Sequence, residues 1–158
     1  MVANEFQYLR IIPISEWLAV PLKGINVKGF DTNIEEESLQ NTNFRKVLWT
    51  SEFQQLVVMS IPVDGEIGKE VHGENDQFIR IEQGQAEAVI DGRKITLGDD
   101  DVIIIPKGAE HNVVNTSTDT DLKLYTIYSP PHHKDGTVHV TKAEADADDE
   151  HFDGVTSE

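Results

Sequence analysis

The feature that most constrains the fold of this chain is a series of short apolar runs, rich in β-branched and aromatic residues and bounded by turn-forming residues. Runs of this length and composition between turn signals are typical of β-strands. Asp91-Gly92 separates two of the runs and strongly indicates a hairpin, because the tight turn needs positive φ at both central residues. The sequence therefore predicts an all-β sandwich or barrel. The runs span residues 44–49, 55–61, 77–82, 86–90, 93–97, 102–105 and 122–128.

The predicted strands lie in a chain of 158 residues, a length that suits one domain. We divide it into an N-terminal arm and linker at residues 1–43, a barrel at 44–131, and a C-terminal loop and acidic tail at 132–158. Prolines and glycines interrupt residues 1–30, so we expect an extended arm there. The arm would pack on the barrel or on a second subunit through Ile11, Ile12, Trp17 and Leu18.

Polar segments flank the predicted barrel. Residues 31–43 predict either a linker or a short helix. Residues 142–158 hold seven acidic residues and one lysine, which favours a solvated tail, with an acidic docking segment as the alternative. Within this region, residues 141–151 would form a short helix capped by Thr141 or stay disordered.

Composition excludes several classes of partner and chemistry. The chain carries 13 basic and 29 acidic residues, a net charge of −16, so neither nucleic acid nor an anionic membrane is an expected partner. The absence of cysteine excludes disulfides, thiolate metal sites and cysteine nucleophiles. No run reaches the roughly 18 apolar residues of a membrane span, and the first residues lack a signal-peptide pattern. We therefore expect a cytoplasmic protein.

The residues most suited to chemistry lie at the ends of the predicted strands. Side chains at i and i+2 of a strand share a face, so Glu70 and His72 project together. Gln77 begins the next strand after a turn and can face back towards them. His111 is distant in sequence, and only the closed barrel would bring it near. Together these four side chains predict one metal site, with an unmetallated polar pocket as the alternative.

The predicted donor set is two imidazoles, one carboxylate and one amide oxygen. Two histidines and a carboxylate with open positions are the arrangement of non-haem Fe(II) oxygenases, and Mn(II), Ni(II) and Zn(II) also accept such ligands. The sequence thus predicts one divalent ion, Fe, Mn, Ni or Zn. Ile79 and Ile81 follow Gln77 on the same face and would line the pocket below the metal.

The spacing of these residues resembles the two motifs of the cupin superfamily. In the first motif His72 matches the second histidine, followed by four residues to Gln77 and six more to Gly84. The second motif is matched throughout, by Pro106, Gly108, His111 and Asn115. The resemblance covers about residues 44–131 and implies a double-stranded β-helix, the cupin or jelly-roll barrel.

The match also contains departures. Glu70 stands where the family has its first histidine, and Gln77 stands where it has its glutamate. The carboxylate has in effect moved, so the site keeps one negative charge and has one imidazole fewer. The motif glycines fall on Asp64 and Asp100. These departures leave the identity of the metal open.

The resemblance extends to a small single-domain cupin group often described as mannose-6-phosphate isomerase-like, a label that reflects the fold. It implies a metal-dependent enzyme of dioxygenase or isomerase type that acts on a small organic substrate. The alternative is a non-catalytic module that binds a small ligand or a metal. Cupin barrels commonly pair through outer strands, so the resemblance also implies a homodimer.

Other polar residues are interpreted more simply. His132, His133 and His139 follow the last long strand and are predicted to be loop residues, with a lid over the pocket as the alternative. Arg80 alternates with inward-facing residues and should face outward, in a salt bridge or a dimer contact. His151 belongs to the acidic tail. Of Tyr125 and Tyr128, which lie on opposite faces of the last strand, at most one lines the cavity.

Overall fold

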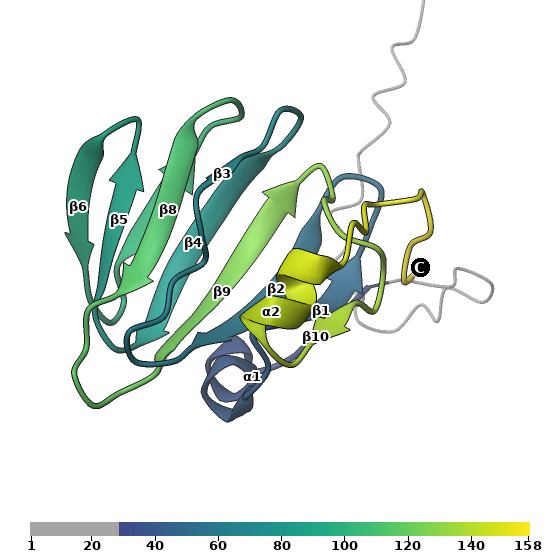
Figure 1. Ribbon diagram of the computed structural model, residues 1–158. Coiled ribbons are helices and arrows are strands. Elements are labelled where there is room, and N and C mark those ends of the chain that lie inside the picture. The colour runs from purple at the N-terminus through teal and green to yellow at the C-terminus, as the bar shows by residue number, and fades with distance from the viewer. Residues whose placement is uncertain (1–28) are drawn as a thin grey trace, which may run out of the picture.

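The computed structural model describes residues 29–158, so the predicted arm and its apolar contacts lie outside the described residues. In these described residues, ten strands form two antiparallel sheets that share one apolar core (Figure 1). The six-stranded sheet has the order β10-β1-β2-β9-β4-β7, and the four-stranded sheet has the order β3-β8-β5-β6. The strands are β1 (Arg45–Thr50), β2 (Gln55–Ile61), β3 (Glu70–Val71), β4 (Asp76–Gln83), β5 (Ala86–Ile90), β6 (Arg93–Leu97), β7 (Val102–Ile105), β8 (Glu110–Asn115), β9 (Leu122–Ser129) and β10 (Val138–His139).

Alternation along the strands builds the core, as β4 illustrates. Gln77, Ile79 and Ile81 are buried, whereas the intervening Phe78 and Arg80 face the outside of the sheet. Burying one aliphatic side chain of this size stabilises a fold by about 1.5–3 kcal/mol. The predicted all-β class is confirmed, and Arg80 makes its predicted salt bridges, with Glu82 and Asp100.

Three turns show how the chain reverses between strands. Asp91 and Gly92 have φ of 47° and 79°, so the predicted hairpin between β5 and β6 is confirmed. Asp64 and Asp100 also have positive φ, 62° and 69°. These are the two positions where the cupin motifs carry glycine, so aspartate adopts here the left-handed backbone that glycine adopts most easily.

Two short helices flank the sheets. Helix α1 (Ile34–Gln40) begins after Asn33, whose side chain accepts a hydrogen bond from Glu36 N, and it packs against β2, β4 and β9 (Figure 1). Helix α2 (Lys142–Ala147) begins after Thr141, which accepts from Glu144 N as an N-cap should. Residues 31–43 and 141–151 were each predicted to contain a short helix as one of two alternatives, and the structure has a helix in both regions. Neither helix has the length or apolar content to span a membrane.

The residues after α2 return to the barrel. Phe152 N donates to the His132 carbonyl at 2.9 Å, and Ser157 N donates to the Thr50 carbonyl at 2.9 Å. Glu150 is buried. The prediction of a solvated tail is wrong for this residue, because tertiary hydrogen bonds outweigh the cost of removing its carboxylate from water. His139 likewise lies in β10, paired with Arg45 of β1, and not in a loop.

Candidate metal centre

The register of β3 on β8 brings the first two candidate ligands together. Glu70 and His111 are direct partners across this antiparallel pair, and His72 follows Glu70 on the same face of the chain. Glu70 Oε2 lies 3.1 Å from His72 Nε2 and 3.8 Å from His111 Nε2. One ligand atom from each residue lies within 4.8 Å of the other two. The barrel thus brings His111 to Glu70 and His72.

Gln77 reaches the same interior from the opposite sheet. It lies at the start of β4, pairs with Tyr128 of β9 and is only 1% exposed. Gln77 Nε2 donates to the Tyr128 hydroxyl at 3.1 Å. With the amide nitrogen on Tyr128, Gln77 Oε1 has no hydrogen-bond partner among the described residues. Its role as a fourth ligand stays a prediction.

Each candidate ligand has one buried atom without a hydrogen-bond partner among the described residues. Leaving a buried polar atom unpaired costs about 1–3 kcal/mol. Glu70 Oε2 and His72 Nε2 lie 3.1 Å apart and can pair with each other only when this nitrogen carries a proton, so with an unprotonated Nε2 all four atoms need a physical reason. A bound cation supplies one. Two atoms that each lie about 2.1 Å from one ion are roughly 3–4.2 Å apart, a range that includes both distances from Glu70 Oε2. The four atoms are Glu70 Oε2, His72 Nε2, Gln77 Oε1 and His111 Nε2.

Backbone contact sets the tautomer of His111. Its Nδ1 lies 3.0 Å from the Ala109 carbonyl oxygen, which can only accept a hydrogen bond. Nδ1 therefore carries the proton, and the lone pair of a neutral ring is on Nε2. A hydrogen bond from the second ring nitrogen to a carbonyl is the usual support of a metal-binding histidine.

A positive side chain holds Glu70 in its ionised form. Arg45 of β1 places one guanidinium nitrogen 3.9 Å from Glu70 Oε1. Burial by itself raises the pKa of the Glu70 carboxyl. The short polar contact with His72 and the charges of His72, Arg45 and His111 outweigh burial, and the pKa is lowered. The centre thus keeps a carboxylate anion, the form that binds a metal.

Aromatic side chains that the sequence did not assign to the site pack around His72. The ring of Tyr128 meets His72 edge-on with centroids 5.6 Å apart, and the ring of His132 lies 4.4 Å from His72. Burial raises the pKa of the Tyr128 hydroxyl, so this group is neutral. Alternation along β9 allowed either Tyr125 or Tyr128 to face inward. The structure selects Tyr128, while Tyr125 packs on Phe78 outside.

The remaining predicted residues lie deeper. Ile79 and Ile81 are fully buried and belong to the apolar core shared by the two sheets. Their role as pocket lining stays a prediction. The cavity that opens beside His72 has a volume of about 480 Å³, and its walls come from the β3–β4 connection and from residues 130–132 and 151–152.

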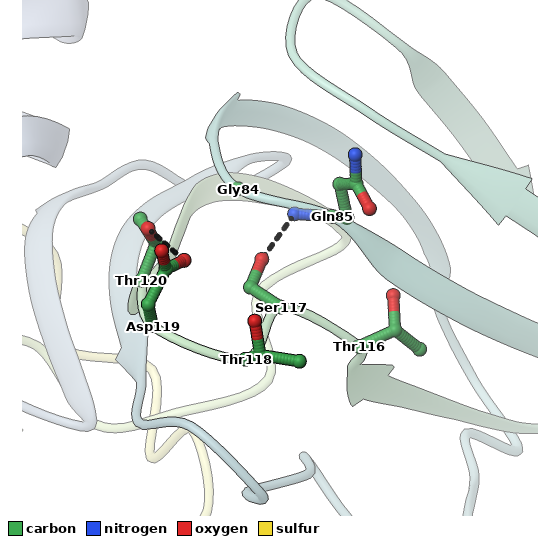
Figure 2. A pocket seen from close by; sticks show the side chains of 7 residues that line it. All are labelled: Gly84, Gln85, Thr116, Ser117, Thr118, Asp119 and Thr120. Carbon is green, nitrogen blue, oxygen red and sulfur yellow. Dashed lines mark hydrogen bonds between the residues drawn. The ribbon is translucent and has the colours of Figure 1, made fainter.

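A second hollow lies at the other end of the barrel. It has a volume of about 460 Å³, and Figure 2 shows its lining residues, which follow the ends of β4 and β8. Ser117 Oγ accepts a hydrogen bond from Gln85 N, and Thr120 Oγ1 donates to Asp119. These contacts stabilise the loops, and this hollow lacks the converging ligand atoms of the other end. The lining residues are Gly84, Gln85 and Thr116–Thr120.

Several known proteins are similar to this chain in sequence or in architecture. Residues 57–128 match the family model of the cupin domain. YrkC, an uncharacterised protein of Bacillus subtilis, is 45% identical over 130 residues, which cover 78% of this chain and 69% of YrkC. The chain belongs to the cupin family. An uncharacterised protein of Acanthamoeba polyphaga mimivirus is 43% identical over 116 residues, with 72% of each chain covered.

Solved structures of other proteins resemble the structure of this cupin. The crystal structure of BH2720 from Bacillus halodurans has a TM-score of 0.74 and 43% identity, and the match covers 78% of this chain and 98% of that one. KdgF from Halomonas sp. has a TM-score of 0.51 and 22% identity, with 54% of this chain and 76% of that chain covered. The second likeness shows the fold alone. Because both curated relatives are uncharacterised, relatedness establishes the family and not an activity.

Proposed function

We propose that this cupin is a metal-dependent enzyme that acts on a small organic substrate. Glu70, His72, Gln77 and His111 hold one divalent ion in this proposal. The observation that carries it is the convergence of buried ligand atoms: one atom each from Glu70, His72 and His111 lies within 4.8 Å of the other two, and Gln77 Oε1 and His111 Nε2 have no hydrogen-bond partner among the described residues. Three of the side chains already lie within coordination reach of one another.

The donor set suits Fe(II), and it also suits Mn(II), Ni(II) and Zn(II). When bound, the ion supplies either open coordination positions for oxygen and substrate or Lewis-acid polarisation of a carbonyl group. The protein supplies the rest. The contact with His72 and the charge of Arg45 keep Glu70 ionised. The Ala109 carbonyl orients His111, and the Tyr128 hydroxyl contacts the Gln77 amide.

The two enzymatic versions place different demands on Glu70. In the dioxygenase version it is a ligand throughout. In the isomerase version, which corresponds to the resemblance to the mannose-6-phosphate isomerase-like group, a base must move a proton, and Glu70 is then ligand or base but not both. The oriented His111 and the ionised Glu70 favour two imidazoles and one carboxylate as the ligands, so we put the dioxygenase version first.

Metal analysis of the purified protein tests the proposal. We expect close to one equivalent of a transition metal, and uptake of Fe, Mn, Ni or Zn by the stripped protein. His72→Ala and His111→Ala should each lower the metal content. A wild-type protein that binds none of these ions would rule the proposal out. Oxygen consumption by the metal-loaded protein separates the dioxygenase from the isomerase, and metal binding without turnover of any tested substrate favours the non-catalytic module.

A further inference from the structure

A cavity of about 480 Å³ opens directly onto His72, and this volume is in the range of pockets for small organic ligands. One wall is the β3–β4 connection, which includes Val71 and Asn75. The facing wall consists of residues 130–132 and of His151 and Phe152, far from His72 in sequence. The cavity therefore exists only where the end of the chain folds back onto the barrel.

A buried carboxylate fixes the facing wall. Glu150 Oε1 accepts from His133 Nδ1 at 2.6 Å, and Glu150 Oε2 accepts from Lys134 N at 2.7 Å. Burial raises the pKa of Glu150, but these donors outweigh burial and lower it, so the group is ionised. The hydrogen bond from Phe152 N to the His132 carbonyl joins the same two segments, the one around Glu150 and the one around His133. Residues 148–158, here called the C-terminal segment, are thus attached to the loop that carries His132.

Two polar side chains at the cavity carry a ring or amide nitrogen without a hydrogen-bond partner among residues 29–158. Asn75 lines the cavity and is 3% exposed, and its Nδ2 has no hydrogen-bond partner among residues 29–158. The ring nitrogens of His132 also make no hydrogen bond to the described part of the chain, although the ring packs on His72 and Tyr128. A buried amide donor and a free imidazole are groups that a ligand oxygen would satisfy.

The charge of the lining selects against anions. Among residues 29–158, the side chains that line this cavity include no lysine or arginine, and Glu74 contributes a carboxylate. Rings and apolar side chains make up much of the surface, from Pro130, Pro131, His132 and Phe152. Such a lining suits a flat uncharged molecule, because apart from the proposed metal ion it offers, among the described residues, no lysine or arginine to pair with a phosphate ester.

We propose that this cavity binds the substrate of the metal centre, that the substrate is an uncharged ring compound with oxygen acceptors, and that the C-terminal segment forms the outer wall. This rests on the proposed metal function. It adds a substrate class and gives the C-terminal segment a role in binding. Asn75 and His132 contact the ligand oxygens, and Glu150 is a positioning residue that acts through His133 and Lys134.

Maltol, an uncharged hydroxypyranone with adjacent carbonyl and hydroxyl oxygens, is a suitable probe because its ultraviolet absorbance reports binding. We would titrate it into the Zn(II)-loaded full chain and measure Zn(II) affinity separately by competition calorimetry. Glu150→Gln and Asn75→Ala should each raise the Kd for maltol by about tenfold, the size expected for loss of one buried hydrogen bond or its support, with Zn(II) affinity changed less than about twofold.

Asp153→Asn is the matched control for Glu150→Gln, because it removes one exposed carboxylate from the same segment. It should bind maltol as the wild type does. If Glu150→Gln fails to fold, His151→Ala replaces it, since His151 is an exposed residue of the same wall. If Glu150→Gln and His151→Ala both bind maltol with the wild-type Kd, the C-terminal segment does not form the outer wall of the binding site. If inorganic phosphate competes with maltol at an equal or lower Kd, the ligand is not restricted to uncharged molecules.

The outcomes also separate the two proposals. Failure of the wild-type chain to bind Zn(II) or any other tested ion overturns the metal centre and the ligand class together. Normal Zn(II) binding with maltol affinity unaffected by the variants overturns only the cavity assignment. Hydrogen exchange in the metal-free protein is a third readout: Glu150→Gln should speed exchange of the Phe152 amide, and unchanged exchange would overturn the role of Glu150 in holding the wall.

Discussion

Metal binding should raise the thermal stability of this protein through His111 and not through His139. Both histidines are buried, at 2% and 5% exposed, and both make one hydrogen bond, His111 to the Ala109 carbonyl and His139 to Asp148. Of these two histidines, only His111 lies in the proposed metal centre. His139→Ala is therefore a control that removes the same side chain from the same kind of environment.

The size of the shift follows from linkage. Metal at about 100 times its Kd stabilises the folded state by about 2.7 kcal/mol. The unfolding entropy of a chain of 158 residues is roughly 0.33 kcal/mol per kelvin, so the Tm rises by about 8 °C. If His111→Ala weakens the affinity by about a hundredfold, the same metal concentration stabilises by only about 0.4 kcal/mol, or about 1 °C.

Differential scanning calorimetry with and without a chelator measures the shift. Both variants should lower the Tm of the metal-free protein, because each leaves a cavity and an unpaired acceptor. The comparison therefore uses the difference between metal-loaded and metal-free forms. A full shift in His111→Ala, or a lost shift in His139→Ala, would refute the assignment of the centre.

Four further predictions concern single features. Gln77→Glu restores the carboxylate of the cupin motif and should lower the metal Kd about tenfold, because it adds an anion to a cation site; calorimetric titration measures this. Asp64→Gly should raise the free energy of unfolding by up to about 1 kcal/mol in urea, since Asp64 is exposed and has φ of 62°; a loss of stability would contradict the account of its backbone. Because the pKa of Glu150 is lowered from 4.5, its contribution to stability is full above pH 4.5 and is lost as pH falls through the lower folded-state value, so Glu150→Gln should flatten the pH dependence of the urea midpoint there. We also propose a homodimer that uses the outer face of the six-stranded sheet around Ile104, which is 68% exposed. Ile104→Glu and removal of residues 1–30 should each lower the sedimentation coefficient, and unchanged sedimentation of both variants would contradict the dimer.

The strand pattern and the motif spacing made much of the site predictable. Period-two alternation placed Glu70 and His72 on one face, and the register of β3 on β8 then puts Glu70 opposite His111. The same alternation buried Gln77. These relations depend on local geometry and on a spacing that the barrel imposes. They can therefore be worked out without knowledge of any side-chain contact.

The side chains that contact Glu70 and His133 could not be predicted in the same way. Arg45 reaches Glu70 from a different sheet, and Glu150 reaches His133 by the return of the chain end. Both contacts are set by tertiary packing, and no periodicity marks them. The acidic composition of the last residues predicted solvation, and only the donors at His133 and Lys134 explain why Glu150 is buried. Nothing in the sequence around Glu150 distinguishes it from the neighbouring acidic residues, because its hydrogen-bond donors are distant in the chain.

The aspartates at positions 64 and 100 bear on how relatives of this protein are found. The glycines of the two cupin motifs describe a backbone conformation, and this chain keeps the conformation while changing the residue. A search pattern that demands glycine at both positions rejects the chain. A pattern that accepts Gly, Asn or Asp there, and Glu or His at position 70, would keep it.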